Sequence, residues 1–253
     1  MIIKTVKILL FVLILGLIFL FGYVIFIYAT LPDISQLKTK NPETTAFIEH
    51  RKKRSKEKKS AYTIRRKWIS LRSIPKILER TIIVAEDASF WVHDGVDFYE
   101  IKESFRTNWE KGRLARGGST ITQQLAKNLY LSPQKSILRK IEEMIIAREM
   151  EKKLTKGRIL ELYINNIELG RGIFGILSAS EYYFDKRPEQ LTISEMIRLC
   201  AIIPKPLHLR PDKASRDSRW RSKVILTRLI QYEFISKMEY EITKSEFQSY
   251  FGD

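Results

Sequence analysis

The sequence is poor in the side chains on which several common kinds of chemistry depend. Its 253 residues include one cysteine, Cys200, and three histidines, His50, His93 and His208. A single cysteine excludes an intrachain disulfide and a redox pair, and it cannot supply a cysteine-based zinc cluster. No His-x-x-x-His, GxSxG or GxxxxGK[ST] sequence is present, and no GxGxxG follows a predicted strand. Zinc sites, serine hydrolases and nucleotide-binding folds are therefore disfavoured.

Acidic residues are scarce relative to basic ones. Lys and Arg number 45 against 29 Asp and Glu, which gives a formal net charge of +16. Such a charge predicts an anionic partner, which could be a nucleic acid, a phosphorylated substrate or a membrane surface. Charge alone does not choose among the three.

Uncharged residues run without interruption from Ile8 to Tyr28. At a rise of 1.5 Å per residue, this length crosses a hydrocarbon core of about 30 Å. We therefore predict a transmembrane helix, because the apolar core of a cleaved signal peptide is shorter and no clear small-x-small cleavage site follows Tyr28. Lysines lie on both sides of this segment, so the positive-inside rule does not fix its orientation.

The remainder of the chain divides by composition. Thr44–Ile48 and Tyr62–Ile69 have the composition of short strands, and the segment between them, RKKRSKEKKS at 51–60, is predicted to be a basic loop. That loop is either a solvated hairpin tip or a site for anionic headgroups. From Ile74 onward, apolar residues recur at spacings of three and four, which predicts a mainly α domain. The expected parts are an N-terminus with its transmembrane helix (1–30), a tether (31–42), a catalytic domain (43–235) and a C-terminal tail (236–253).

The first chemically interesting segment is EDASFWVHDGVD at 86–97. Two adjacent carboxylates, Glu86 and Asp87, follow an apolar run and precede Phe90, Trp91 and His93. A carboxyl group beside aromatic rings can have a raised pKa, which suits acid–base chemistry. The alternative is that Glu86 and Asp87 are helix-end charges and that His93 is a turn residue that donates to a backbone carbonyl.

The second segment is RGGSTITQQLAKN at 116–128. Gly117 and Gly118 would allow a close approach of the backbone, and a polar loop that opens a helix is suited to binding a diphosphate. The polar groups come from Ser119, Thr120, Gln123, Gln124, Lys127 and Asn128. The alternative is an ordinary helix start capped by Ser or Thr.

The third segment is RKIEEMIIAREMEKK at 139–153. On a helix, Glu143 lies one turn from Arg139 and Lys140 and could simply pair with them. Ile146, Ala147 and Met150 share its face, however, so this face is not uniformly polar. A partly buried group of one Glu, one Arg and one Lys indicates a functional site.

These segments, together with ILELYINNIELGRGIFG and ASEYYFDK, resemble in order and spacing the family 51 glycosyltransferases of peptidoglycan synthesis over residues 40–230. Within that family the chain is most similar to the monofunctional biosynthetic transglycosylases. The resemblance implies a mainly α fold, with a lysozyme-like helical lobe and a smaller membrane-facing jaw after the transmembrane helix. It also implies a bacterial inner-membrane protein whose catalytic domain lies on the periplasmic, outer face.

The resemblance assigns roles to particular residues. Glu86 falls on the catalytic base and Glu143 on the second essential glutamate. Substrate-binding positions fall on Asp87, Phe90, His93, Gly117, Gly118, Ser119, Thr120, Gln123, Gln124, Lys127, Asn128, Lys135, Arg139, Lys140 and Asn165. No residue is assigned as a metal ligand; a divalent cation such as Mg²⁺ is allowed, and no organic cofactor is expected.

The implied reaction transfers a growing strand, linked to undecaprenyl diphosphate, onto the 4-hydroxyl of lipid II with inversion. The expected partners are lipid II, the lipid-linked strand, the membrane and cell-wall synthesis proteins, and not nucleic acid. Two alternatives stay open. A non-catalytic membrane-anchored scaffold would bind anionic lipid without needing Glu86 or Glu143, and a lytic muramidase would cleave finished glycan instead of using the lipid-linked precursor.

Overall fold

The computed structural model describes residues 2–110, 117–134 and 136–252, and the chain divides into two units, Met1–Ile34 and Ser35–Asp253. The first unit is essentially helix α1 (Ile2–Ala29). Its segment Lys4–Ala29 has a mean hydropathy of 3.1, so it is long and apolar enough to cross a membrane. This agrees with the transmembrane helix predicted from the sequence.

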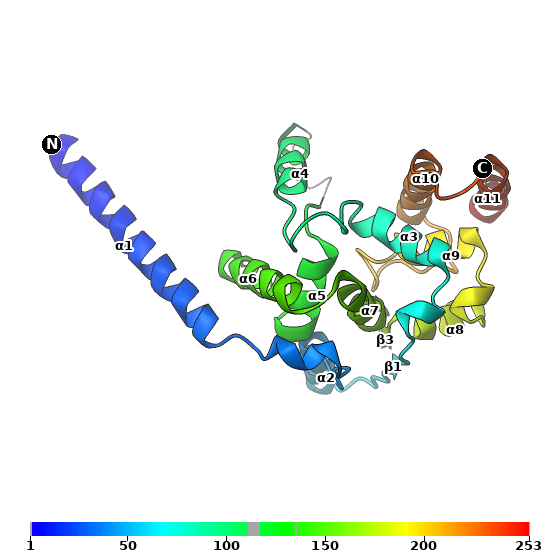
Figure 1. Ribbon diagram of the computed structural model, residues 1–253, viewed down its shortest axis with the longest axis horizontal. Helices are drawn as coiled ribbons and strands as arrows, with labels where there is room; N and C mark the ends of the chain where they lie inside the picture. Colours follow the sequence, from blue (N-terminus) through cyan, green and yellow to red (C-terminus); the bar gives the residue numbers. More distant parts are fainter. Residues whose placement is uncertain (1, 111–116, 135, 253) are drawn as a thin grey trace. The chain divides into compact units, whose positions relative to one another are not determined.

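The second unit is mainly helical, as predicted (Figure 1). Its long helices are α2 (Ala46–Glu57), α3 (Lys76–Glu86), α4 (Phe98–Glu110), α5 (Ile121–Tyr130), α6 (Ile137–Lys153), α7 (Lys156–Asn166), α8 (Ile176–Phe184), α9 (Ile193–Ala201), α10 (Arg216–Gln231) and α11 (Lys237–Phe251). Short 3-10 turns occupy Ile34–Lys38, Leu71–Ser73 and Pro188–Gln190. The segment expected to be a C-terminal tail is thus mostly α11, whose Phe247 and Phe251 are buried.

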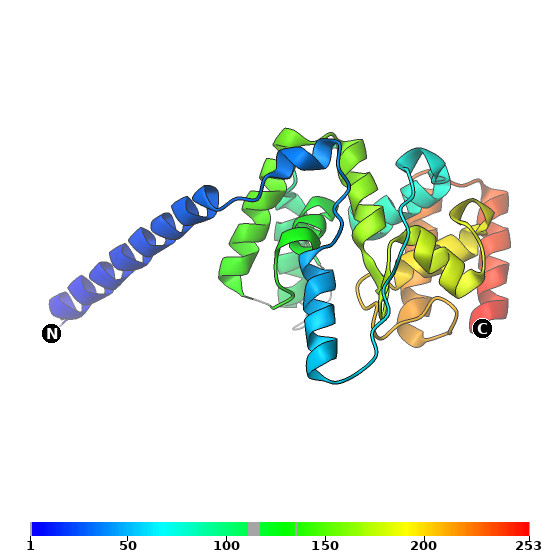
Figure 2. The same cartoon turned by 90° about the horizontal axis from the view of Figure 1, so that it is seen from below.

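Within this unit the helices form two groups that meet at the carboxyl end of α3. Helices α5, α6 and α7 pack together in one group. Helices α3, α9, α10 and α11 pack together in the second group, beside the first (Figures 1 and 2). Leu78 and Ile82 of α3 and Ile121 and Leu125 of α5 are completely buried. The sequence predicted the α domain from Ile77, Ile82, Val84 and Ala85 in α3 and from Ile137, Ile141, Met144 and Ile145 in α6. Of these, Ile82 and Val84 are buried, whereas Ile137 is 83% exposed.

A small sheet with strand order β1-β3-β2 joins distant parts of the chain. Strand β1 (Arg65–Arg66) is parallel to β3 (Ile173–Phe174), and β2 (Glu168–Gly170) is antiparallel to β3 with an irregular register. Gly172 has φ +77°, and a Cβ there would lie 2.1 Å from the carbonyl oxygen of Thr63. Glycine is therefore required for the two segments to approach.

The prediction of a basic loop at 51–60 was wrong, because most of this segment lies in α2. The hydroxyl of Thr45 caps the helix by accepting the N–H of Ile48 at 3.1 Å. Arg51 then donates to both carboxylate oxygens of the buried Glu168, at 2.9 and 2.7 Å. The strand predictions were also wrong outside Arg65–Arg66. The cap of Thr45 and the ion pair with the distant Glu168 stabilise this polar helix. Neither interaction produces a periodic pattern of apolar residues in the sequence.

Candidate active site

Glu86 is the last residue of α3, at the junction of the two helix groups. Its side chain is only 8% exposed. Gln124 donates from Nε2 to Oε2 of Glu86 at 2.9 Å, and Arg221 of α10 donates to Oε1 at 3.1 Å. The hydroxyl of the buried Tyr163 donates to Oε1 of Gln124 at 3.1 Å, which fixes the amide so that its NH₂ faces Glu86. Three helices therefore orient one carboxylate.

Burial controls the protonation of this carboxylate. Removal from water disfavours the charged form, and this largest influence raises the pKa of Glu86 above its ordinary value. Arg221, Gln124 and Lys127 act in the opposite direction, while the neighbouring Asp87 raises the pKa further. A carboxylate with a raised pKa is a stronger base than an ordinary glutamate.

Glu143 is the centre of a second buried group, on α6. Its side chain is 3% exposed; Arg139 donates to Oε2 at 2.6 Å, and Lys140 contacts Oε1. The pairing of Glu143 with Arg139 and Lys140, which helical spacing predicted, is confirmed. The partial burial that the sequence predicted for this group is confirmed as well. Lys140 also donates to the hydroxyl of Ser119 at 2.8 Å, which ties this group to the start of α5.

The first turn of α5 connects the two carboxylate groups. Thr120 caps the helix, and it exchanges hydrogen bonds of 3.1 Å with Gln123 in a capping box. The capped helix start considered for this segment is therefore confirmed. Gln123 also accepts from Lys140 at 3.4 Å, while the next residue, Gln124, binds Glu86. Consecutive glutamines thus reach the two carboxylate groups.

Lys127 lies one turn further along α5, in the electrostatic field of both groups. Burial lowers the pKa of Lys127; Glu143 is the strongest influence in the opposite direction, and Glu86 also acts to raise it. Arg139 and Lys140 lower it further. Its ammonium lies 5.5 Å from the ring centroid of Phe47, and among the described residues it makes no ion pair. This cation is available to an anionic ligand.

Asp87 and His93 brace the loop that follows Glu86. Asp87 accepts the N–H of Ile121 at 2.9 Å and lies 3.0 Å from Nε2 of His93. Because the N–H of Gly95 donates to Nδ1 of His93 at 3.0 Å, the hydrogen-bond network assigns the ring proton to Nε2, which donates to Asp87. The imidazole is a positioning group in this arrangement, and substrate binding by Asp87 and His93 stays a prediction.

We expect Gly95→Ala to destabilise the protein by about 1–3 kcal/mol. Gly95 has φ +84°, and an added Cβ would lie 2.9 Å from Cγ of Glu151 and 3.0 Å from the carbonyl oxygen of Ala147. Thermal unfolding measures the loss. Gly157→Ala is the matched control, because its added Cβ meets only Leu71 at 3.8 Å, an ordinary contact. Equal unfolding temperatures for the two variants would show that this loop is not held as described.

Phe90 and Asn165 are both packed inside the second unit. Phe90 is completely buried, with the ammonium of Lys156 4.6 Å from its ring centroid. Asn165 is completely buried too; it accepts the N–H of Ile69 and donates to the carbonyl oxygens of Ile69 and Glu161, each at 2.8 Å. Both amide hydrogens are used within the fold, and direct substrate binding by Phe90 and Asn165 stays a prediction.

The remaining residues predicted to bind substrate differ in how closely they pack against the rest of the structure. Gly118 packs closely on α4, where an added Cβ would lie 2.9 Å from the hydroxyl oxygen of Ser104, whereas an added Cβ at Gly117 meets nothing within 4 Å. The close approach expected of both glycines therefore holds for Gly118. Asn128 is buried on α5. Lys135 lies outside the described residues.

The sequence reasoning missed Arg221 and Tyr163. Arg221 lies 135 residues from its partner Glu86, in an α10 sequence rich in Arg and Lys. Tyr163 falls within a recognised segment but acts on Glu86 only through Gln124. Conservation of these positions across an alignment of homologous sequences could have singled out either residue, but a single sequence could not.

The described residues offer no ready-made set of protein ligands for a metal ion. Among them, no group of three or more His, Cys, Asp or Glu could hold one. Both oxygens of Glu86 and both oxygens of Glu143 are already occupied by cations or amide N–H groups. The divalent cation therefore stays an expectation from the resemblance, and no step below depends on it.

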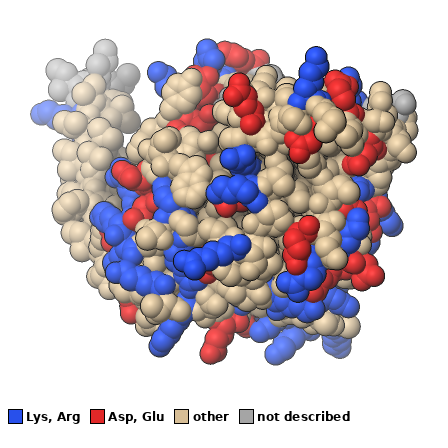
Figure 3. All heavy atoms as spheres, turned by 45° about the vertical axis from the view of Figure 1, so that its right-hand side comes forward, with Lys and Arg blue, Asp and Glu red and all other residues tan. Residues whose placement is uncertain are grey.

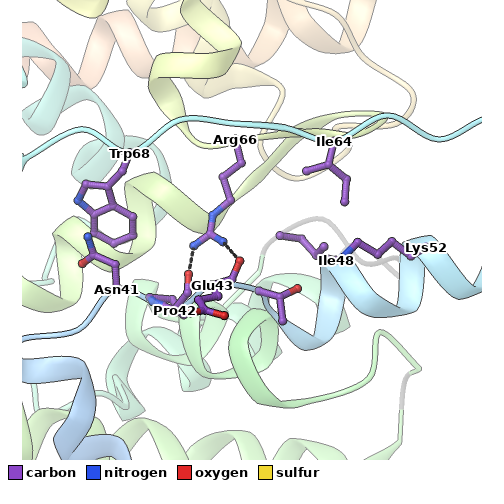
Figure 4. A pocket seen from close by; sticks show the side chains of 9 residues that line it. Asn41, Pro42, Glu43, Ile48, Lys52, Ile64, Arg66 and Trp68 are labelled. Carbon is purple, nitrogen blue, oxygen red and sulfur yellow. Dashed lines mark hydrogen bonds between the residues drawn. The ribbon is translucent and has the colours of Figure 1, made fainter.

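A separate pocket of about 460 Å³ lies where the chain enters the second unit (Figure 4). Ile64, Arg66 and Trp68 line one side, and Asn41 to Thr44 with Ile48 and Lys52 line the other. Arg66 donates to the carbonyl oxygens of Pro42 at 2.7 Å and Glu43 at 2.9 Å. These bonds fasten residues 42–43 to the sheet, so we regard this pocket as structural.

A buried carboxylate beside a cluster of cations is the arrangement expected of an enzyme that performs acid–base chemistry on an anionic substrate. The sequence model of the family described as Transglycosylase matches residues 52–230, and the chain belongs to that family. A biosynthetic peptidoglycan transglycosylase of Nitrosospira multiformis is 41% identical over 183 residues, covering 72% of this chain and 78% of that protein. One of Thiobacillus denitrificans is 43% identical over 176 residues, covering 70% and 76%.

Among solved structures, the crystal structure of penicillin-binding protein 1A from Haemophilus influenzae aligns with a TM-score of 0.41 and 21% identity. The alignment covers 71% of this chain and 17% of that one. The family match contains Glu86, the polar loop and start of α5, and Glu143. All three segments singled out from the sequence therefore lie within the matched domain.

Proposed function

We propose that this transglycosylase polymerises the glycan strands of peptidoglycan. A growing strand linked to undecaprenyl diphosphate is transferred onto the 4-hydroxyl of lipid II with inversion, and undecaprenyl diphosphate is released. The observation that carries the proposal is Glu86, a buried carboxylate with a raised pKa beside a cationic group. A scaffold that only binds anionic lipid has no need of such a carboxylate.

Glu86 acts as the general base. A sugar hydroxyl is a poor nucleophile at neutral pH, and a positioned base contributes about 10²–10⁴-fold to the rate. As the acceptor oxygen forms its bond to the anomeric carbon, its proton passes to Glu86. The bond between that carbon and the phosphate oxygen breaks at the same centre, and its electron pair leaves with the diphosphate.

The cations stabilise the leaving group. Negative charge grows on the diphosphate as the bond breaks, and cations in a poorly solvated site stabilise it strongly. Arg139 and Lys140 are held in place by Glu143, and Lys127 projects from α5 without an ion pair among the described residues. Glu143 therefore acts by positioning these cations. The excess of basic residues is explained without a nucleic acid.

The surface of α4 supports catalysis at a membrane. Phe98, Tyr99, Phe105 and Trp109 are 60%, 71%, 69% and 79% exposed. Exposed aromatic side chains on one helix suit the boundary between headgroups and acyl chains. Together with the apolar α1, they support a membrane-anchored enzyme whose jaw contacts the bilayer. We place it in the inner membrane with the catalytic unit on the outer face, where it would meet cell-wall synthesis proteins.

Basic residues do not cover the second unit uniformly. On the face shown in Figure 3, Lys and Arg gather in groups separated by acidic and uncharged side chains. A net charge of +16 therefore does not amount to one continuous anion-binding surface on this face. This arrangement favours local recognition of a diphosphate over general adhesion to a polyanion.

We expect Arg221→Gln to move the acidic limb of the pH–rate profile to higher pH. Glu86 must be ionised to act as base, and its raised pKa places this limb above the range of an ordinary carboxyl group. Arg221 is the strongest influence that lowers this pKa, so its removal raises the pKa further. The pH dependence of kcat/KM measures the shift. Arg210→Gln, which removes a salt bridge to Asp212 and a contact with the ring of Tyr183, is the control. An unmoved limb for Arg221→Gln would contradict the assignment.

Polymer formation from purified lipid II by the full-length protein in detergent tests the proposed function. Formation of a glycan polymer supports it. Binding of lipid II without any polymer would overturn it in favour of the scaffold.

A further inference from the structure

A groove of about 260 Å³ lies along α3, and the buried side chains of Ile83 and Val84 are among those that line it. Three charged side chains line it, those of Lys76, Glu79 and Arg80, and three aromatic ones, those of Trp91, Tyr232 and Phe234. None of these six residues has a part in the reaction described above. Their combination of flat rings and charges on a concave surface needs an explanation.

The aromatic side chains present accessible faces. Trp91 and Tyr232 are each 50% exposed. The rings of Tyr232 and Phe234 are stacked with centroids 5.8 Å apart, and the guanidinium of Arg80 lies 4.8 Å from the centroid of Phe234. A pyranose ring has one face of C–H groups, which packs on such a ring while its hydroxyls remain solvated.

The charges favour an anionic ligand. The carboxylate of Glu79, 8% exposed, is paired with Lys76 at 2.5 Å. Arg80 has no acidic partner among the described residues; its contact is the ring of Phe234. The groove therefore carries one uncompensated positive charge beside its aromatic rings. A sugar that bears a carboxylate matches both features.

Helix geometry relates the position of the groove to that of Glu86. Glu79 precedes Glu86 by seven residues, which is about 10.5 Å along the axis and nearly the same face of the helix. Helix α10 runs beside α3: its Arg221 binds Glu86, its Arg228 donates to the carbonyl oxygen of Val84 at 3.0 Å, and Tyr232 follows its end in the groove. The groove and Glu86 therefore lie along the same α3–α10 seam, about two turns of α3 apart.

We propose that the α3–α10 groove binds a muramyl-peptide unit, an N-acetylated sugar carrying a carboxylate-bearing peptide, of the strand being polymerised. The proposal rests on the proposed function and adds a subsite to it. The rings of Trp91 and Tyr232 contact the sugar, and Arg80 pairs with the peptide carboxylate. Holding the strand between additions lengthens the product.

The test measures binding apart from catalysis. Full-length Glu86→Gln protein in detergent is titrated calorimetrically with a tetrasaccharide of alternating N-acetylglucosamine and N-acetylmuramyl-peptide. Trp91→Ala and Arg80→Gln, added singly, are expected to raise the Kd by about three- to tenfold. Tyr182→Ala, an aromatic residue with 45% exposure on α8, and Arg187→Gln are the matched controls and leave it unchanged.

A second ligand separates the two contacts. Chitotetraose has no carboxylate, so its weaker binding is expected to respond to Trp91→Ala and not to Arg80→Gln. No binding of the muramyl-peptide tetrasaccharide, or equal binding by the parent and both variants, would overturn the subsite. In the protein with Glu86 intact, the same two variants are expected to start chains at the native rate and make shorter strands. A native protein that makes no polymer would instead contradict the proposed function.

Discussion

Replacing Glu86 by glutamine is expected to lower the rate of glycan polymerisation by at least about 100-fold. Glutamine has the same shape and can still contact Gln124 and Arg221, but it cannot take the proton of the acceptor hydroxyl. Because burial already disfavours the charged form, the substitution is not expected to lower the unfolding temperature. Initial rates with lipid II and thermal unfolding of the same preparation measure the two effects.

Glu189→Gln is the control for this substitution. Its carboxylate is exposed, it pairs only with the exposed Arg187, and it lies in the short turn before α9. We expect native activity from it. Polymerisation by Glu86→Gln within tenfold of the native rate would show that another group removes the proton, and the mechanism would fail even if the family function held.

Replacing Glu143 by glutamine is expected to cost about 3–5 kcal/mol of stability and to abolish most polymerisation. The substitution leaves Arg139 and Lys140 close together without the buried carboxylate that compensates them. Denaturant unfolding gives the change in free energy, and the KM for lipid II reports whether the cations still bind the diphosphate. Glu149→Gln, on the same helix and paired with the exposed Lys152, should cost no more than about 1 kcal/mol.

A double substitution separates the two roles of Glu143. Adding Lys140→Met to Glu143→Gln removes the uncompensated charge, so stability is expected to recover partly. Polymerisation is not expected to recover, because the diphosphate loses a cation. Recovery of activity together with stability would show that this buried group serves only the fold.

The sequence predicted the mainly α fold because the apolar periodicity of α3 and α6 is local. It did not predict α2, whose residues are mostly charged. That helix depends on the cap of Thr45 and on the contact of Arg51 with Glu168, 117 residues away. The residue pattern of one helix carries no information about a partner elsewhere in the chain, such as Glu168 on β2.

The candidate site likewise contains contacts that the sequence predicts and contacts that it does not. The pairing of Glu143 with Arg139 and Lys140 follows from helical spacing, and the cap at Thr120 follows from its segment. The contact between Glu86 and Arg221 depends on the packing of α3 against α10. The alternative for His93 was a turn residue that donates to a backbone carbonyl. In the structure its Nδ1 instead accepts the N–H of Gly95, and its Nε2 contacts the carboxylate of Asp87.

The most direct measurement is the fate of radiolabelled lipid II incubated with the native full-length protein in detergent. The account predicts a polymer of β-1,4-linked disaccharides, sensitive to a muramidase, with release of undecaprenyl diphosphate. Lipid II that is bound and recovered unchanged, or preformed glycan that the protein shortens, would contradict it.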